Sequence, residues 1–302
     1  MAKLIQWFPG HMKKAMRDME EKRALCDGVI CVLDSRAPIA TYNPKLPEIF
    51  AGKPVLYVLN KSDLSDGKSE KFAAMIEAQG KSCVAISAVN GASRRVLEKR
   101  LQILTKEKRE RAESKGVTRR FRYTVVGIPN TGKSTVVNLL GGAKRAKTGD
   151  IAGVTRDVRW IKCADFDLLD TPGTMPPSCK TQYLARHLAY IGSLNDDILD
   201  IADVALELLK ELKADYPAAL QERYGIDCGG NDAETDKTAD EEERTREAVE
   251  MLETACRRRG FILRGGEFDY ERGARAVIDD FRKGRLGKIC LENPSDFADV
   301  KF

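Results

Sequence analysis

The chain alternates short apolar, β-branched runs with amphipathic or polar stretches that are long enough to form helices. This alternation is typical of an α/β fold, a mostly parallel sheet covered by helices. We predict six strands: Val29–Asp34, Val55–Asn60, Cys83–Ser87, Tyr123–Gly127, Val158–Cys163 and Phe166–Asp170. Three of them run directly into polar or glycine-rich motifs. Since open α/β sheets bind nucleotides at the carboxyl ends of their strands, we expect a ligand site at that edge.

The strand pattern disappears after Pro177, and the apolar residues that follow have helical spacing. We predict helices over Val204–Lys213, Thr245–Arg258 and Tyr270–Lys283. Gly284 is expected to cap the last of them. An acidic, polar stretch near residues 231–243 is interpreted as a mobile insertion. We therefore expect an α/β domain over residues 1–178, which includes an N-terminal helix, and a smaller all-α domain over residues 179–302.

The strongest chemical signal is a glycine-rich run between a predicted strand and a helix, Gly127-Ile128-Pro129-Asn130-Thr131-Gly132-Lys133-Ser134. Its glycines let backbone N–H groups surround phosphate oxygens, Lys133 reaches the terminal phosphates, and Ser134 offers a hydroxyl to Mg²⁺. The predicted phosphate-binding residues are Asn130, Thr131, Gly132, Lys133, Ser134 and Thr135. A bare structural turn is the weaker alternative.

Two later segments complete a nucleoside triphosphate site. Asp170-Thr171-Pro172-Gly173 follows a strand about forty residues after the phosphate loop, so we expect Asp170 to reach Mg²⁺ through water and Gly173 to contact the γ-phosphate. Thr155, in Gly153-Val154-Thr155 between them, is expected to supply the second hydroxyl for Mg²⁺. The alternative for Thr155 is an ordinary loop position.

The base is expected to be guanine. Asn60-Lys61-Ser62-Asp63 ends a strand, and a carboxylate at Asp63 accepts the guanine N1–H and N2–H₂ groups, a pattern that adenine cannot supply. We therefore assign Asn60, Lys61 and Asp63 to the base, with Asp63 selecting GTP over ATP. Ser87 and Ala88 follow the next strand, where a backbone N–H could meet guanine O6. Alone, that last signal is weak.

The guanine motif precedes the phosphate loop by about seventy residues, the reverse of the usual order in GTP-binding proteins. The charged stretch Thr105–Arg120 is interpreted as a helix end and linker between the two halves of such a permuted sheet, with a solvated tether and a nucleic-acid contact as its two open roles. At this point the chain resembles the circularly permuted GTPases, and among them the ribosome biogenesis GTPase A (YlqF-type) family. The resemblance also rests on Trp7-Phe8-Pro9-Gly10-His11-Met12-Lys13-Lys14-Ala15, on Asp34-Ser35-Arg36-Ala37-Pro38, and on Gly265-Gly266 through Asp280-Phe281-Arg282-Lys283-Gly284-Arg285-Leu286-Gly287.

The resemblance covers nearly the whole chain and implies a permuted P-loop GTPase domain followed by a helical domain that binds ribosomal RNA. It implies a role in late assembly of the large ribosomal subunit. It also implies GTP hydrolysis that is slow alone and stimulated by ribosomal particles and K⁺, with Asn130 helping to hold the ion. The expected partners are a large-subunit precursor, rRNA and GTP or GDP, and the expected state is a monomer.

The group that orients the attacking water is the open point of the mechanism. Many GTPases place a glutamine directly after the Asp-x-x-Gly motif, but this chain has Thr174 there, where the resembling family typically has an apolar residue. We expect Lys133 and Thr155 to stabilise the transition state. The resemblance implicates His11, whose neutral imidazole can orient water or relay a proton. The alternative is that His11 only docks the first helix.

Charge is unevenly distributed along the chain. Residues 1–180 carry 33 Lys and Arg against 19 Asp and Glu, a net +14, whereas residues 181–302 carry 18 against 27, a net −9. A positive field of this size favours polyanion binding, with a highly charged solvated surface as the alternative. The eight cysteines include no Cys-x-x-Cys pair and are predicted to be buried thiols rather than zinc ligands.

The sequence shows neither an apolar run of the roughly 20 residues needed to span a bilayer nor a secretory signal over Met1–Gly10. We therefore expect a cytoplasmic protein without membrane contact. Two other functions stay open on the residues alone: a GTP-dependent signalling switch that binds a protein partner, and a nucleotide-binding module without turnover.

Overall fold

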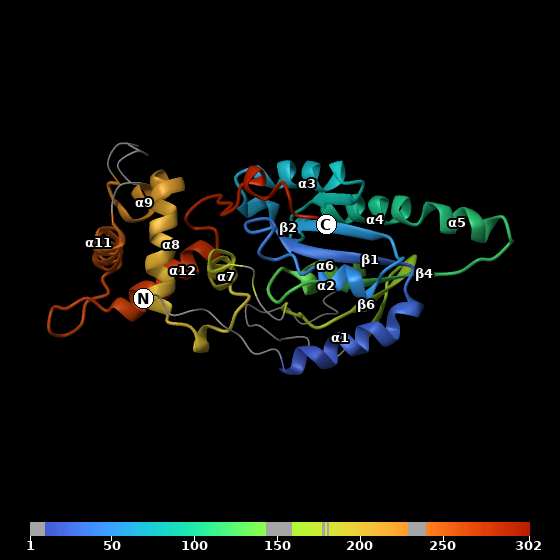
Figure 1. The fold of residues 1–302 in the computed structure, drawn as a ribbon, viewed down its shortest axis with the longest axis horizontal. Helices are drawn as coiled ribbons and strands as arrows, with labels where there is room; N and C mark the ends of the chain where they lie inside the picture. The colour runs from blue at the N-terminus through green and yellow to red at the C-terminus, as the bar shows by residue number, and fades with distance from the viewer. Residues whose placement is uncertain (1–9, 143–158, 177–178, 180, 229–239) are drawn as a thin grey trace.

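The computed structural model of this chain describes residues 10–142, 159–176, 179, 181–228 and 240–302. A sheet covered by helices lies at one end of the molecule, and a group of helices lies at the other (Figure 1). The helix α7 (Gln182–Tyr190) lies between the two. The C-terminus returns to the sheet (Figure 1).

All six predicted strands form. They are β1 (Gly28–Asp34), β2 (Val55–Asn60), β3 (Ser82–Ala85), β4 (Phe121–Val126), β5 (Arg159–Lys162) and β6 (Phe166–Asp170). They build one sheet in the order β3-β2-β1-β4-β6-β5, in which β5 runs antiparallel to β6 and the other pairs are parallel. The first three strands extend the sheet one way and the last three the other way. The seam between β1 and β4 is therefore a topological switch point, where such sheets bind ligands.

Helices cover both faces of the sheet, and every residue of β1 is buried as a result. Ile30 and Val32 face a core shared with α4 (Ser93–Leu104) and α6 (Lys133–Gly141). Val29 and Cys31 face the other core, together with α7. That second core also contains side chains of α1 (Gly10–Lys22), α2 (Lys45–Ile49) and α3 (Lys68–Ala78). The short helix α5 (Lys106–Glu113) follows α4, so the predicted linker begins as a helix.

The helical unit consists of α8 (Ile201–Asp215), α9 (Pro217–Tyr224), α11 (Glu241–Arg259) and α12 (Tyr270–Arg282). α8 packs against both α11 and α12. The three predicted helices are confirmed, and Gly284 follows α12 with a left-handed φ of 69°. Within the described residues, no helix has both the length and the apolar character needed to cross a membrane.

The predicted insertion near residues 231–243 requires one correction. Glu241–Glu243 form the first turn of α11, because the Asp240 carboxylate caps the helix by accepting the Glu243 N–H at 2.7 Å. Carboxylates in a first turn are also favoured by the helix dipole. Residues 231–239 lie outside the described part of the chain.

The eight cysteines are all free, as predicted, but not all are buried. Five are buried, and three are half-buried: Cys163, Cys179 and Cys228. The prediction of burial was wrong for these three, because burial follows tertiary packing rather than the local sequence: Cys256 is buried although three arginines follow it.

The C-terminal tail, residues 284–302, packs on the α/β domain (Figure 1). Ile289 donates its N–H to Leu64 O at 2.9 Å, and Leu291 donates to Arg36 O at 2.8 Å. The last residue, Phe302, is buried and stacks on Tyr42, with ring centroids 4.5 Å apart. The tail thus contacts the α/β domain although it follows the helical unit in sequence. The division at residue 178 stays a prediction.

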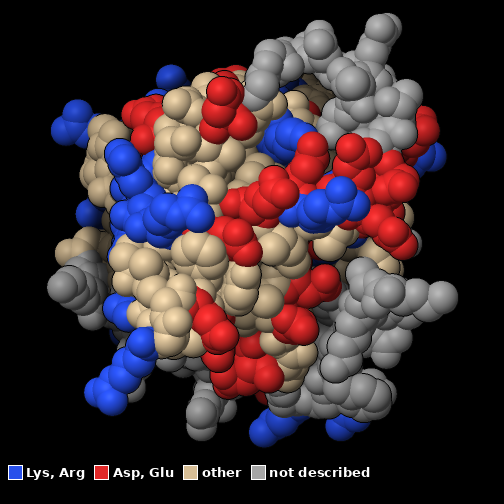
Figure 2. Space-filling view, turned by 90° about the vertical axis from the view of Figure 1, so that its left-hand side faces the viewer, with Lys and Arg blue, Asp and Glu red and all other residues tan. Residues whose placement is uncertain are grey.

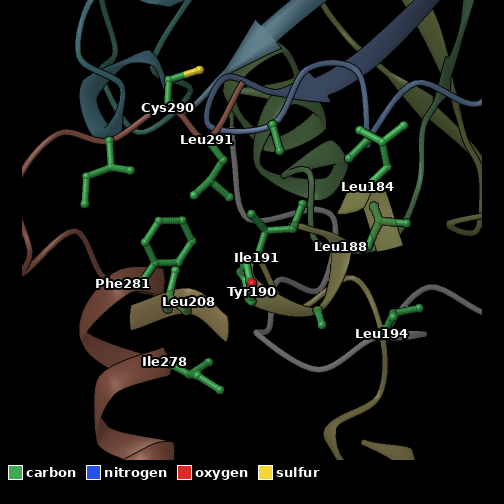
Figure 3. Close-up of a cluster of buried hydrophobic side chains, with 14 of the residues drawn as sticks. Leu184, Leu188, Tyr190, Ile191, Leu194, Leu208, Ile278, Phe281, Cys290 and Leu291 are labelled. Carbon is green, nitrogen blue, oxygen red and sulfur yellow. The ribbon is translucent and has the colours of Figure 1, made fainter. Parts of the chain in front are cut away.

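Apolar side chains fill the space between the helices and the tail (Figure 3). Leu188 comes from α7, Leu208 from α8, Phe281 from α12 and Leu291 from the tail, and all four are buried. Burying a side chain of this size contributes roughly 1.5–3 kcal/mol. The helical unit is therefore held against the α/β domain by a shared core.

His187 of α7 is a buried ion-pair partner within this region. Its side chain is 0% exposed, Nδ1 lies 3.1 Å from Glu292 of the tail, and Nε2 lies 3.1 Å from Glu211 of α8. Burial lowers the pKa of His187, but its hydrogen bonds to both glutamates and their charges outweigh burial and raise the pKa to about 9. At neutral pH the imidazolium therefore ties α7, α8 and the tail together.

This ion pair predicts a pH-dependent stability. Because the pKa of folded His187 lies above its ordinary value, its stabilisation is complete below about pH 6.5 and is lost as the pH rises through about 9. We expect His187→Gln to lower the free energy of unfolding by about 3 kcal/mol at pH 6 and by much less at pH 9.5. Urea unfolding of both proteins at the two pH values measures this. An equal deficit at both would contradict the ion pair.

Candidate functional site

The side-chain amide of Asn60 joins three of the predicted motifs. Asn60 is buried at the end of β2, and its Nδ2 donates to Thr131 O in the phosphate loop at 3.0 Å. Its Oδ1 accepts the Ala88 N–H at 3.0 Å. The guanine motif, the phosphate loop and the turn after β3 therefore converge, although the first two are 71 residues apart.

Lys61 makes a second link to the phosphate loop. Its Nζ donates to Asn130 O at 2.6 Å and lies 2.9 Å from Asp34 Oδ2. Lys61 and Asn130 both have a left-handed φ of 62°, and they are the non-glycine residues with positive φ in the described chain. Such backbone conformations persist where surrounding contacts hold them, and functional sites are where they gather.

Two glycines allow the close approach of these segments. A Cβ on Gly132 would lie 2.2 Å from Asn60 Nδ2, so any side chain there would displace the bridging amide. A Cβ on Gly173 would lie 2.7 Å from Pro129 N, which brings the segment after β6 against the phosphate loop. The glycines at these positions are therefore required by packing as well as by room for phosphate.

Lys133, at the start of α6, is the buried cation of the site. Its Nζ donates to Ile128 O at 2.7 Å, inside the loop whose N–H groups are expected to bind phosphate. Desolvation lowers the pKa of Lys133 to about 8, although the nearby Asp170 carboxylate acts in the opposite direction. A phosphate that replaces Ile128 O would favour the charged amine.

Asp170 fits a divalent cation. Its side chain is 0% exposed, and within the described residues neither carboxylate oxygen has a hydrogen-bond partner, while Arg159 Nε lies 3.7 Å from Oδ2. Burial raises the pKa of Asp170, and the Lys133 charge opposes this. A buried carboxylate without hydrogen bonds is costly unless a cation binds it. Asp170 and the hydroxyl of Ser134 are the described residues that would hold Mg²⁺.

The remaining predicted residues either lie near the phosphate loop and Asp170 or are not among the described residues. Asp63 is exposed, so the desolvation that would make it selective has to come from the bound base. Ser87 and Thr135 are half-buried. The N–H of Ala88 donates to Asn60 in this structure. Thr155 lies outside the described residues, and so does the side chain of His11, whose backbone is in α1.

Thr174 is 0% exposed, and its hydroxyl has no hydrogen-bond partner within the described residues. Its backbone carbonyl accepts a hydrogen bond from Asn43 Nδ2 at 3.0 Å. A hydroxyl enclosed in this way does not face solvent. In this conformation Thr174 does not take the place of the missing glutamine.

From the sequence alone, Asp34 and Arg36 had no predicted role beyond a motif shared with the resembling family. Both are buried, and Arg36 binds the two Asp34 oxygens at 3.0 and 2.9 Å. Burial alone would raise the pKa of Asp34, but Arg36 and Lys61 hold it below its ordinary range. Asp34 thereby holds the Lys61 amine in place. Arg36 also donates a hydrogen bond to Arg282 O of α12 at 3.1 Å. The only sequence signal was an aspartate at a strand end two residues before an arginine.

The lowered pKa of Lys133 predicts proton uptake when nucleotide binds. Because phosphate prefers the ammonium form, GDP affinity should fall about tenfold between pH 7 and pH 9, and binding at pH 8 should take up about half a proton. Calorimetry in buffers of different ionisation enthalpy counts these protons. Absence of uptake at pH 8 would mean that Lys133 is fully charged before binding.

Known proteins are similar to this chain in sequence and in fold. A family model described as "50S ribosome-binding GTPase" matches residues 122–224. The chain is 37% identical to ribosome biogenesis GTPase A of Bacillus cereus, over 98% of this chain and 96% of that protein. It is 28% identical to ribosome biogenesis GTPase A of Thermotoga maritima, over 98% and 97%.

Two solved structures agree in fold. The GDP-bound structure of TM YlqF aligns with a TM-score of 0.62 at 26% identity, over 93% of this chain and 100% of that one. The GNP-bound YlqF from T. maritima aligns with a TM-score of 0.63 at 25% identity, over 93% and 98%. Both confirm a P-loop GTPase domain with a mostly parallel sheet followed by helices. The chain is a GTPase, and it belongs to the ribosome biogenesis GTPase A family.

Proposed function

We propose that this GTPase acts in late maturation of the large ribosomal subunit and binds rRNA in a nucleotide-dependent way. Membership of a ribosome biogenesis family supports the ribosomal partner. The observation that carries the RNA proposal is a group of arginines without carboxylate partners on the helical unit. A large-subunit precursor is then the partner, and the protein acts on it as a monomer.

The arginine group lies at the end of α11, in the loop that follows, and at the start of α12. Its members are all exposed, and none makes an ion pair with a described residue: Arg257, Arg258, Arg259, Arg264 and Arg272. Of the other two exposed arginines on these helices, Arg275 pairs with Glu271 at 3.0 Å, and Arg246 makes no ion pair with a described residue. Figure 2 shows a cluster of Lys and Arg on one side of this face of the helical unit, and more Asp and Glu, with some Lys and Arg among them, on the other side. Local charge here is positive although residues 181–302 are acidic overall.

Aromatic rings hold three of these arginines in place. Arg257 lies over Phe268 at 5.3 Å from the ring centroid, while Arg259 and Arg272 lie over Phe261 at 5.9 and 4.5 Å. Guanidinium groups held on rings keep their N–H edges free for phosphate oxygens and can stack on bases. Exposed arginines beside aromatic rings favour RNA over a solvated surface as the explanation.

For hydrolysis, we propose that Lys133 and the loop N–H groups stabilise charge on the leaving diphosphate. Ser134, Thr155 and Asp170 would hold Mg²⁺, which neutralises phosphate charge when bound. Asn130 would help to hold K⁺ through its amide oxygen. Gly173 would contact the γ-phosphate. Because the chain runs from Gly173 through Thr174 directly towards α7, loss of that phosphate would shift the helical unit.

Binding to large-subunit precursors tests the proposal. We expect the double change Arg258→Glu with Arg264→Glu to weaken co-sedimentation of the GTP-analogue form by at least about tenfold at moderate salt, and to flatten the salt dependence. The matched control is Arg111→Glu on α5, an exposed arginine at the far end of the molecule. Equal losses in the two proteins would contradict a special role for the arginine group on the helical unit.

The nucleotide arm of the same experiment separates the alternatives. Stronger co-sedimentation with a GTP analogue than with GDP is expected. Binding that is insensitive to the nucleotide and to the arginines would contradict the proposal and favour a signalling switch with a protein partner.

His11 remains the proposed catalytic histidine, on the strength of the family resemblance. We expect His11→Ala to reduce precursor-stimulated GTP turnover by roughly 10²-fold or more, the usual size of a general acid–base contribution, while GTP affinity stays unchanged. Phosphate release under single-turnover conditions measures the first quantity, and fluorescent-nucleotide titration measures the second. Unchanged turnover would reduce His11 to a docking residue.

A further inference from the structure

The turn that leads from α7 towards the helical unit contacts the phosphate loop directly. This turn follows α7 and consists of residues 191–195. Ser193 donates its hydroxyl to Pro129 O at 2.7 Å, and Asn130 Nδ2 donates to Gly192 O. Ser193 is only 2% exposed, so its hydrogen bond is shielded from water. Two consecutive residues of the phosphate loop are therefore held by two consecutive residues of the turn.

The turn has a defined shape because it caps α7. Gly192 has a left-handed φ of 75°, and its N–H donates to Ala189 O at 3.0 Å, while Ser193 N–H donates to Leu188 O at 2.9 Å. This is the Schellman pattern, in which a left-handed glycine closes the helix. The cap fixes the direction of both the Gly192 carbonyl and the Ser193 hydroxyl.

Arg282 of α12 holds the residues on either side of this turn. Its side chain donates to Ala189 O at 2.7 Å and Tyr190 O at 3.0 Å, and it forms a two-point ion pair with Asp196 at 2.7 and 2.8 Å. A Cβ on Gly192 would lie 3.2 Å from the Arg282 guanidinium and 3.4 Å from Asn130 Nδ2. The turn is therefore packed between α12 and the phosphate loop.

In the phosphate loop, the residue that contacts Gly192 is Asn130, whose backbone is left-handed. Asn130 has a left-handed φ, and its carbonyl is held by Lys61 at 2.6 Å. Its side-chain amide is held by Gly192. The tip of the loop is thus fixed by the guanine motif on one side and by the helical unit on the other. Neither contact uses the N–H groups expected to bind phosphate.

We propose that Gly192 and Ser193 are positioning residues of the GTP site, and that through them the helical unit sets the affinity of the phosphate loop for nucleotide. The proposal rests on the GTP site itself and not on the RNA partner. By linkage, any partner that shifts α7 or α12 changes nucleotide affinity, and nucleotide changes affinity for that partner by the same factor.

The test is nucleotide release from the full-length protein, followed with GDP that carries a fluorescent N-methylanthraniloyl group. Ser193→Ala should raise the dissociation rate constant about three- to tenfold, the range for loss of one buried hydrogen bond. The KM for GTP should rise by a similar factor while kcat changes little. Ser193→Thr, which keeps a hydroxyl, should restore slow release.

The matched control is Tyr216→Phe. The Tyr216 hydroxyl also joins the helical unit to its surroundings, with Lys68 Nζ at 2.9 Å and Cys290 O at 2.7 Å. Within the described part of the chain, these three residues form no hydrogen bond with the phosphate loop. We expect Tyr216→Phe and Ser193→Ala both to lower the melting temperature, but only Ser193→Ala to change the rate of GDP release. Equal release rates in Ser193→Ala, the control and the parent protein would overturn the proposal. If Ser193→Ala does not fold, Arg282→Lys decides, with faster release expected and unchanged release contradicting it.

Discussion

The position of the nucleotide site depends on one buried amide, that of Asn60. Its two hydrogen bonds, one donated to the phosphate loop and one accepted from the turn after β3, are 3.0 Å long and closed to water. A buried amide that loses such a partner costs about 1–3 kcal/mol, so the three segments are stable together and not apart. The seam between β1 and β4 brings the two halves of the chain close enough for this contact.

Other features of the site follow from that convergence. Gly132 has to lack a side chain because Asn60 occupies the space. Lys61 and Asn130 adopt left-handed conformations that bring the Lys61 amine to the Asn130 carbonyl. Asp34 forms an ion pair with the Lys61 amine, and Arg36 in turn holds Asp34. These contacts prepare the base and phosphate ends of the site before nucleotide binds, which reduces the entropy that binding must offset.

The sequence predicted what local pattern determines. All six strands and the three long helices were correct within a few residues, because periodicity and end signals are local. The motifs at the strand ends were sufficient to place Asn60 near Thr131 once a parallel sheet was assumed. The sequence could not predict that Thr174 would be enclosed, or that Phe302 would stack on Tyr42. Both depend on contacts between residues far apart in the chain, for which a single sequence carries no signal.

The permuted motif order explains why the contacts between α7, α12 and the phosphate loop matter. Here the segment after Gly173 leads into α7, and Gly173 itself packs against Pro129. The cap of α7 is hydrogen-bonded to Pro129 and Asn130. α7 is therefore linked to the phosphate loop both by the chain that precedes it and by the turn that follows it. A motion of α7 therefore cannot leave the phosphate loop unchanged unless Ser193 and Gly192 give up their hydrogen bonds. Arg36 adds a third path, because it binds Asp34 at one end and the last carbonyls of α12 at the other. In a chain of the ordinary motif order the segment after the second switch would continue within the sheet, and a separate interface would have to carry this coupling.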